Sequence, residues 1–158
     1  MGQLPDTTFL SFGKPKAMWR PILDTYEKRL AKAGSFKHVI LREKGEDAAA
    51  VKAAASKLVE PYCEDAYVLV FDERGKDLTS PKFAQLLAAV RPKKLTAIIG
   101  TSYGLGDADL AGADRLVRLG AMTLPHEIAR VTALEQLYRA ETILAGHPYH
   151  HGLSLIHI

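Results

Sequence analysis

Apolar side chains follow two different spacings along this chain, and the two spacings alternate. Residues 66–71 and 95–99 are short, continuous apolar runs, which are typical of strands buried on both faces of a sheet. Residues 18–33, in contrast, place their large apolar side chains three or four positions apart, as on one face of a helix. The predicted strands are 7–11, 36–41, 66–71, 95–99 and 115–118, and the predicted helices are 18–33, 46–59, 79–90, 107–113 and 125–145.

Turn-forming and capping residues set the boundaries of these elements. Gly34 and Gly146 are expected to follow two helix ends, and Pro61 is expected to end the second helix. Thr79 or Ser80 can cap the third helix, and residues 72–76 are predicted to form a polar loop. Strands and helices alternate without a repeat or linker, which predicts a single α/β domain with a parallel sheet and helices on both faces.

Composition places the chain among ordinary folded proteins. It has 158 residues, 47% hydrophobic and 25% charged, which suits one domain. No apolar run reaches the roughly 18 residues needed to span a membrane, and the amino-terminal segment lacks a signal-peptide pattern. The single cysteine, Cys63, favours a reducing, cytoplasmic setting. The net charge of +3 permits an anionic partner such as RNA. A basic patch that binds RNA is one interpretation of Lys14, Lys16, Arg20 and Arg74. The slightly favoured alternative is that their charges are scattered and solvated.

Three polar or glycine-containing loops follow predicted strands, after Phe71, Ile99 and Arg118. In open parallel sheets, ligands bind at the carboxyl ends of the strands. The loop from Gly100 to Gly106 would let a ligand approach the backbone closely, but its glycine spacing matches neither a dinucleotide-binding fingerprint nor a P-loop. An ordinary strand-to-helix turn is an equal alternative for this loop.

Residues 119–126 form a segment that is too apolar for an ordinary surface loop. Either the protein buries this segment, or the segment wraps an apolar ligand surface such as an adenine ring. His126 falls in the first turn of the next helix, where a structural role is the more common one.

The last helix and the tail carry the remaining candidates. Thr132, Glu135, Arg139 and Thr142 are spaced to share one face of a mostly apolar helix. A Glu–Arg pair four residues apart is usually solvated and worth only about 0.3–0.5 kcal/mol, but this charged stripe is expected to face a site or a subunit interface. The histidines of residues 147–151 lack a second cluster with ligand spacing, so no metal site is predicted.

Five short motifs occur in order along the chain. They are Phe71-Asp72-x-x-Gly75-Lys76, Ile98-Ile99-Gly100-x-x-x-Gly104-Leu105, Met122-Thr123-Leu124-Pro125-His126, Glu135-x-Leu137-Tyr138-Arg139-Ala140 and His147-Pro148-Tyr149-His150. In this order they resemble the RlmH family. Members of that family are SPOUT-class methyltransferases that methylate N3 of a pseudouridine in the RNA of the large ribosomal subunit. The resemblance covers nearly the whole chain, and its most specific motifs follow Ala66.

The resemblance implies a parallel sheet with a C-terminal trefoil knot, a homodimer, S-adenosylmethionine as cofactor, and ribosomal RNA within the ribosome as substrate. The cofactor contacts carried over by motif are Phe71, Gly100, Leu119, Gly120, Ala121, Met122, Thr123 and Leu124. The catalytic roles carried over fall to four residues. They are His150 or Tyr149 for handling the proton of the acceptor nitrogen, Arg139 for stabilising negative charge or holding a phosphate, and Glu135 for orienting Arg139.

Two features depart from the family pattern. Thr101 stands where the family usually has a second glycine, and its side chain is expected to crowd the cofactor. Residues 153–158 continue past the usual family end and are predicted to be a non-native or disordered tail, which leaves 1–152 as the methyltransferase domain. Two other functions stay open: a non-catalytic module that binds RNA or the ribosome, and a different nucleotide-binding α/β enzyme.

Overall fold

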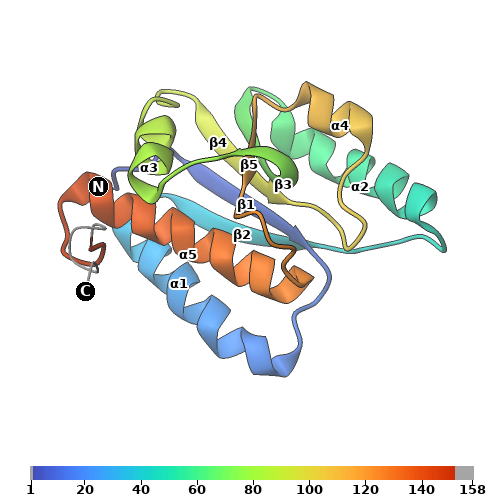
Figure 1. The fold of residues 1–158 in the computed structure, drawn as a ribbon, viewed down its shortest axis with the longest axis horizontal. Helices are drawn as coiled ribbons and strands as arrows, with labels where there is room; N and C mark the ends of the chain where they lie inside the picture. The colour runs from blue at the N-terminus through green and yellow to red at the C-terminus, as the bar shows by residue number, and fades with distance from the viewer. Residues whose placement is uncertain (1, 152–158) are drawn as a thin grey trace.

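The computed structural model describes residues 2–151, so the predicted tail at 153–158 lies outside the described residues. Five strands form one parallel sheet in the order β2-β1-β4-β3-β5 (Figure 1). The predicted parallel α/β sheet is therefore confirmed, while the trefoil knot stays a prediction. The strands are β1 (Thr7–Phe12), β2 (Phe36–Leu41), β3 (Ala66–Asp77), β4 (Lys94–Ile99) and β5 (Arg115–Arg118).

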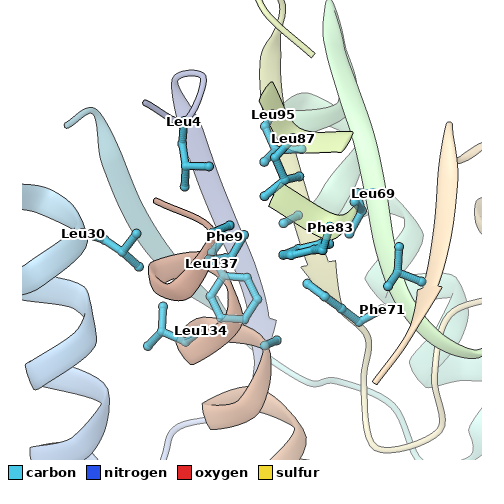
Figure 2. Close-up of a cluster of buried hydrophobic side chains, with 14 of the residues drawn as sticks. Leu4, Phe9, Leu30, Leu69, Phe71, Phe83, Leu87, Leu95, Leu134 and Leu137 are labelled. Carbon is cyan, nitrogen blue, oxygen red and sulfur yellow. The ribbon is translucent and has the colours of Figure 1, made fainter. Parts of the chain in front are cut away.

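Helices cover both faces of this sheet, because alternate strand side chains point to opposite faces. Phe9 and Leu69 belong to the core on one face, and Leu10 and Val70 belong to the core on the other. Figure 2 shows the first core, where Leu134 and the neighbouring Leu137 approach Phe9. The helices on the first face are α1 (Arg20–Ala33), α3 (Ser80–Ala88) and α5 (His126–Ala145), and those on the second are α2 (Ala48–Cys63) and α4 (Asp107–Gly112).

Local signals place most of the helix ends correctly. Asp47 caps α2 by accepting a hydrogen bond from the Ala50 amide, and Thr79 rather than Ser80 caps α3. Gly146 ends α5 with a φ of 72°, a conformation that glycine adopts without strain. The predicted helix from residue 18 begins as the short helix η1 (Ala17–Trp19), which continues directly into α1.

Two predicted boundaries are wrong. Residues 72–76 are not a loop but part of β3, which bulges after Phe71 and returns to pair with β5 from Lys76 onward. Their polarity reflects the rim of a cavity rather than a turn. Pro61 does not end α2, which runs on to Cys63. A proline in the last turn removes only one backbone hydrogen bond, and packing of the apolar face of α2 on the sheet outweighs that loss.

Candidate functional site

A cavity of about 870 Å³ opens at the bulge of β3, from Phe71 onward, and at the carboxyl ends of β4 and β5. Its volume lies in the range of small-molecule sites. The loops after β4 and β5 form much of its wall, and Lys52 of α2 closes one side. Every residue that the sequence predicts as a cofactor contact lines it, namely Phe71, Gly100, Leu119, Gly120, Ala121, Met122, Thr123 and Leu124.

The walls of this cavity combine apolar surface with charges of both signs. Ile99, Leu119 and Leu124 supply apolar surface, and the charged side chains that line it are Lys52, Asp72, Glu73, Arg74 and Arg118. Three of these five charges, Asp72, Arg74 and Arg118, are already paired. Arg74 contacts Asp72 at 3.1 Å and Asp107 at 3.2 Å, and Arg118 contacts Asp77 at 2.7 Å.

The predicted basic surface is weakened by similar pairs. Arg20 contacts Asp24 at 2.9 Å and Glu27 at 2.7 Å, and Arg74 is paired as described above. Lys14 and Lys16 are exposed in the loop before η1. The four residues therefore do not form one unpaired cationic patch.

The apolar segment 119–124 is not buried by the protein itself. The side chain of Met122 is 85% exposed, and Ala121 and Thr123 are exposed beside it. The segment contains no helix or strand, which leaves backbone N–H and C=O groups available to a ligand. The described residues therefore argue against burial by the protein itself, and the wrapped ligand stays a prediction.

The glycine-containing loop after β4 is held in place by side-chain hydrogen bonds. The hydroxyl of the buried Thr101 donates to the Gly104 carbonyl at 2.7 Å and accepts from the Tyr103 amide at 3.2 Å. Glu43, in the loop after β2, accepts hydrogen bonds from the amide and the hydroxyl of Ser102. Thr101 therefore uses its hydroxyl within the loop.

The four predicted catalytic residues lie together on α5 and in residues 147–151, the tail of the described chain. We call them the tail cluster. Arg139 donates from Nη2 to Glu135 Oε2 at 2.7 Å, and its Nη1 lies 3.0 Å from His150 Nδ1. The Tyr149 hydroxyl donates to the same Glu135 oxygen at 2.8 Å. The Arg139 and Glu135 side chains are only 25% and 17% exposed, so this is not the usual solvated helix pair.

Aromatic side chains hold the tail against α5 and α1. The Tyr149 ring packs edge-on against Tyr138 at a centroid distance of 4.8 Å, and the Arg139 guanidinium lies 4.9 Å from the Tyr149 centroid. Tyr26 of α1 meets the Tyr149 hydroxyl at 3.2 Å. Burial, followed by the hydrogen bonds to Tyr26 and Glu135, raises the pKa of Tyr149 well above that of an ordinary phenol.

The two threonines predicted on this helix face lie outside the cluster. Thr142 donates to the Arg139 carbonyl of its own helix. Thr132 lines a smaller cavity of about 150 Å³, which shares Phe71, Arg118 and Leu119 with the larger one. Gln136 borders the same cavity, accepts a hydrogen bond from Ser80 and donates to Glu135 Oε1 at 3.1 Å. The sequence did not single out Gln136, because its contact with Ser80 joins two helices that are far apart along the chain.

The structure does not bring the cavity and the tail cluster together within one chain. His126 and Ala129 of α5 line the cavity, whereas Arg139 lies much further along the same helix. The ten positions from Ala129 to Arg139 correspond to about 15 Å along the axis, at 1.5 Å per residue.

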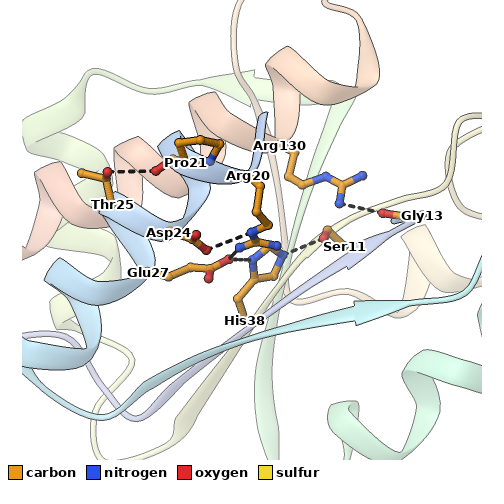
Figure 3. Close-up of polar contacts among 9 residues, drawn as sticks. All are labelled: Ser11, Gly13, Arg20, Pro21, Asp24, Thr25, Glu27, His38 and Arg130. Carbon is orange, nitrogen blue, oxygen red and sulfur yellow. Dashed lines mark hydrogen bonds and ion pairs between the residues drawn. The ribbon is translucent and has the colours of Figure 1, made fainter. Parts of the chain in front are cut away.

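A buried polar cluster supports the start of α5 (Figure 3). Arg130 is 1% exposed and donates to the carbonyls of Gly13 at 2.7 Å and Phe12 at 2.8 Å. The pKa of Arg130 is lowered, chiefly because of this burial. His126 also donates to the Phe12 carbonyl, from Nε2 at 2.9 Å. His126 thus has the expected structural contact and lines the cavity as well.

His38 lies in the same buried region, between Glu27 and Ser11. Its Nδ1 donates to Glu27 Oε2 at 2.6 Å, so Nε2 accepts from the Ser11 hydroxyl at 2.7 Å. Burial lowers the pKa of His38, and Arg130 and Arg20 lower it further, while Glu27 opposes the shift. The folded state therefore favours the neutral imidazole.

Stability should consequently fall in mild acid. The unfolded imidazole takes up a proton near its ordinary pKa of about 6.5, while the folded one stays neutral to lower pH. The contribution of His38 is thus present above the unfolded pKa and is lost as pH falls from that value toward the folded pKa. Its slope is at most about 1.4 kcal/mol per pH unit. Urea unfolding of the wild type and His38→Gln between about pH 7.5 and about pH 5 measures the difference. Equal slopes for the two proteins would contradict the expectation.

Comparison with known proteins decides the family. A family model described as "Predicted SPOUT methyltransferase" matches residues 6–150. The ribosomal RNA large subunit methyltransferase H of Geobacter metallireducens is 37% identical over 146 residues, which covers 89% of this chain and 95% of the relative. The chain belongs to the RlmH family of SPOUT methyltransferases. The similarly named protein of Agrobacterium fabrum is 43% identical, covering 79% of this chain and 85% of the relative. The resemblance seen in the motifs of this RlmH-family chain, and its predicted class as a methyltransferase, are both confirmed.

The fold of the RlmH-family chain also has a solved counterpart. A probable methylase family protein from Haemophilus influenzae Rd KW20 superposes with a TM-score of 0.57 and 13% identity. The match covers 90% of this chain and 67% of that protein, and it shows a shared fold. Among residues 2–151, no group of three or more His, Cys, Asp or Glu is placed to hold a metal ion. No helix in this part of the chain is long and apolar enough to cross a membrane.

Proposed function

We propose that this chain transfers the methyl group of S-adenosylmethionine to N3 of a pseudouridine in large-subunit ribosomal RNA. The observation that carries the proposal is the gathering of all eight predicted cofactor residues around one cavity. Membership of the methyltransferase family supports the reaction type, and the relatives named as ribosomal RNA large subunit methyltransferases support the substrate. A substrate within the ribosome would place the reaction in the cytoplasm.

The cavity walls suit the parts of this cofactor. Ile99 and Leu124 offer apolar surface to an adenine ring, and the backbone of 119–124 offers hydrogen bonds to its edge. Lys52 and Glu73 place opposite charges on the wall, which suits a zwitterionic amino-acid end. When bound, S-adenosylmethionine supplies an electrophilic methyl group on a sulfonium. The task of the protein is then to hold the acceptor nitrogen in line with that methyl group.

A homodimer would complete the site. Within one chain, Arg139 lies about 15 Å along α5 from Ala129, the last residue of that helix that lines the cavity, and no single nucleobase bridges that distance. Large apolar side chains are exposed at the start of the helical face: Met18 is 75% exposed, Ile22 41% and Ile128 40%. A two-fold dimer that packs this surface against the tail end of α5 in a second copy would bring the tail of one protomer toward the cavity of its partner.

Methyl transfer to ribosomes tests the proposal. Ribosomes from cells that lack the modification should accept label from S-adenosylmethionine, and digestion of the RNA should yield a methylated pseudouridine. Calorimetry should show binding of S-adenosylmethionine in preference to NAD or ATP, which separates the proposal from another nucleotide-binding enzyme. Ribosome binding without methyl transfer would instead identify a non-catalytic module.

A further inference from the structure

The direction of each hydrogen bond in the tail cluster follows from the chemistry of its donors. Arginine has only N–H donors, so the 3.0 Å contact from Arg139 Nη1 requires His150 Nδ1 to be the acceptor. A neutral imidazole with a bare Nδ1 carries its proton on Nε2. His150 therefore presents an N–H group at Nε2, and its basic nitrogen is already occupied.

Tyr149 is likewise not placed to remove a proton from the acceptor. Its hydroxyl donates to Glu135 and accepts from Tyr26. The phenolic proton thus lies on the carboxylate side of the hydroxyl. The raised pKa of Tyr149 keeps the phenol protonated at neutral pH.

Glu135 has no vacant basic oxygen either. Its Oε2 accepts from Arg139 Nη2 and Tyr149, and its Oε1 accepts from Arg139 Nε at 3.4 Å and from Gln136 at 3.1 Å. Arg139 has five N–H groups in its guanidinium, and these contacts leave hydrogens on Nη1 and Nη2 for another acceptor. Among the described residues, the cluster therefore leaves donor hydrogens on Arg139 and His150 without a partner, and no basic atom.

We infer that the tail cluster is a donor site that holds the negatively charged form of the acceptor ring, and that none of its side chains removes the proton. The inference rests on the proposed function, because it concerns the imide nitrogen of the acceptor. His150 Nε2–H and the remaining N–H groups of Arg139 bind an imide oxygen beside that nitrogen. Donors aimed at developing charge stabilise it most strongly in a site that excludes water.

Methyl transfer to the imide nitrogen needs no base from the protein. The imide N–H gives its proton to a solvent base, hydroxide or water, and the ring anion carries its charge on N3 and the flanking oxygens. The N3 electron pair then forms the new N–C bond to the methyl group. The S–C bond breaks, and its electron pair stays on sulfur, which becomes a neutral thioether.

His150 contacts Arg139, and other charged and titratable groups of α5, α1 and the tail belong to the same cluster. Arg139 binds Glu135, and the Tyr149 hydroxyl meets Glu135 and Tyr26. Arg29 of α1 lies 5.4 Å from the ring centroids of Tyr26 and Tyr138. The tail adds His147, which accepts from the Tyr149 amide, and the exposed His151. The only carboxylate among these groups is Glu135, and Arg139 neutralises it.

The tautomer of His150 can be measured without cofactor or RNA. Long-range nitrogen–proton NMR spectra of the labelled protein should show His150 protonated at Nε2 and bare at Nδ1 at neutral pH. Substitution Arg139→Gln should change the His150 nitrogen shifts, because the donor to Nδ1 is lost. A His150 tautomer protonated at Nδ1 would overturn the inference.

Kinetics supply the second test. The variant His150→Gln keeps an N–H donor but has no titrating base, whereas His150→Ala keeps neither. We expect His150→Gln to stay within about tenfold of the wild-type kcat with the same pH profile, and His150→Ala to lose on the order of 10²-fold. Equal losses in both variants, or no loss in either, would overturn the donor role. An inactive wild type that binds S-adenosylmethionine would instead count against the proposed function.

Discussion

Substitution Arg139→Ala should lower the rate of methyl transfer by on the order of 10²–10³-fold. Arg139 contacts Glu135 and His150 and packs over Tyr149, so its loss removes donors and disperses the whole cluster. Binding of S-adenosylmethionine should be largely unchanged, because Arg139 is not among the residues that line the cavity and acts on the acceptor ring in the proposed site. Single-turnover methylation and calorimetry on the same preparation measure the two quantities.

Lys32→Ala is the matched control, since it removes an exposed cation from α1 outside the cluster. It should methylate at close to the wild-type rate. If Arg139→Ala also kept the wild-type rate, the tail cluster would have no part in the reaction. Lost cofactor binding in Arg139→Ala would mean that the two regions are coupled, contrary to their separation in the structure.

Mixed dimers can show whether two chains build one site. Ala121→Trp fills the cavity and should abolish cofactor binding, while Arg139→Ala removes the acceptor side. A two-fold dimer with one of each chain keeps one intact combination, so an equal mixture should regain about a quarter of wild-type activity. A mixture as inactive as its components would contradict a site shared between protomers.

Substitution Arg130→Met should destabilise the fold by about 3–5 kcal/mol. Arg130 satisfies the carbonyls of Phe12 and Gly13, and its Nη2 lies 2.8 Å from Glu127 Oε1 without hydrogen-bond alignment. Its loss leaves those carbonyls and a largely buried carboxylate without their cation. Urea unfolding at neutral pH measures the change.

The second substitution Glu127→Gln should recover part of this loss in the double variant, because no carboxylate then stays buried without its cation. Glu127→Gln alone should cost less than Arg130→Met. A loss below about 1 kcal/mol in Arg130→Met, in the range of an exposed pair, would contradict the structural role given to this arginine.

The strands and most helices follow from local sequence patterns, and the structure confirms them. The bulged end of β3 does not, because the polar residues 72–76 look like a loop until β5 pairs with them. The close backbone contact at Gly75, where a Cβ would lie 2.6 Å from Leu116, is visible only in the folded chain. Long-range pairing thus outweighed the local preference at this position.

The candidate site, too, was only partly predictable from the sequence. The sequence motifs identify the eight cavity residues and the four tail residues. Residue spacing does not predict that α5 keeps the two groups apart. Arg130 also escapes sequence reasoning, because arginine is rarely buried and only two strand-end carbonyls explain its position. Ser11, His38 and Glu27 come from three separate elements, so their contact has no local signal.

The position of β1 in the sheet has a consequence for folding during synthesis on the ribosome. β1 lies between β2 and β4, although β4 is synthesised much later. During translation the first strand can pair with β2 through the α1 crossover, but its other edge stays open until β4 leaves the ribosome. An open apolar strand edge invites pairing with other chains. Nascent chains truncated before β4 should therefore depend on chaperones, and the cavity at the strand ends can form only as the last third of the polypeptide emerges.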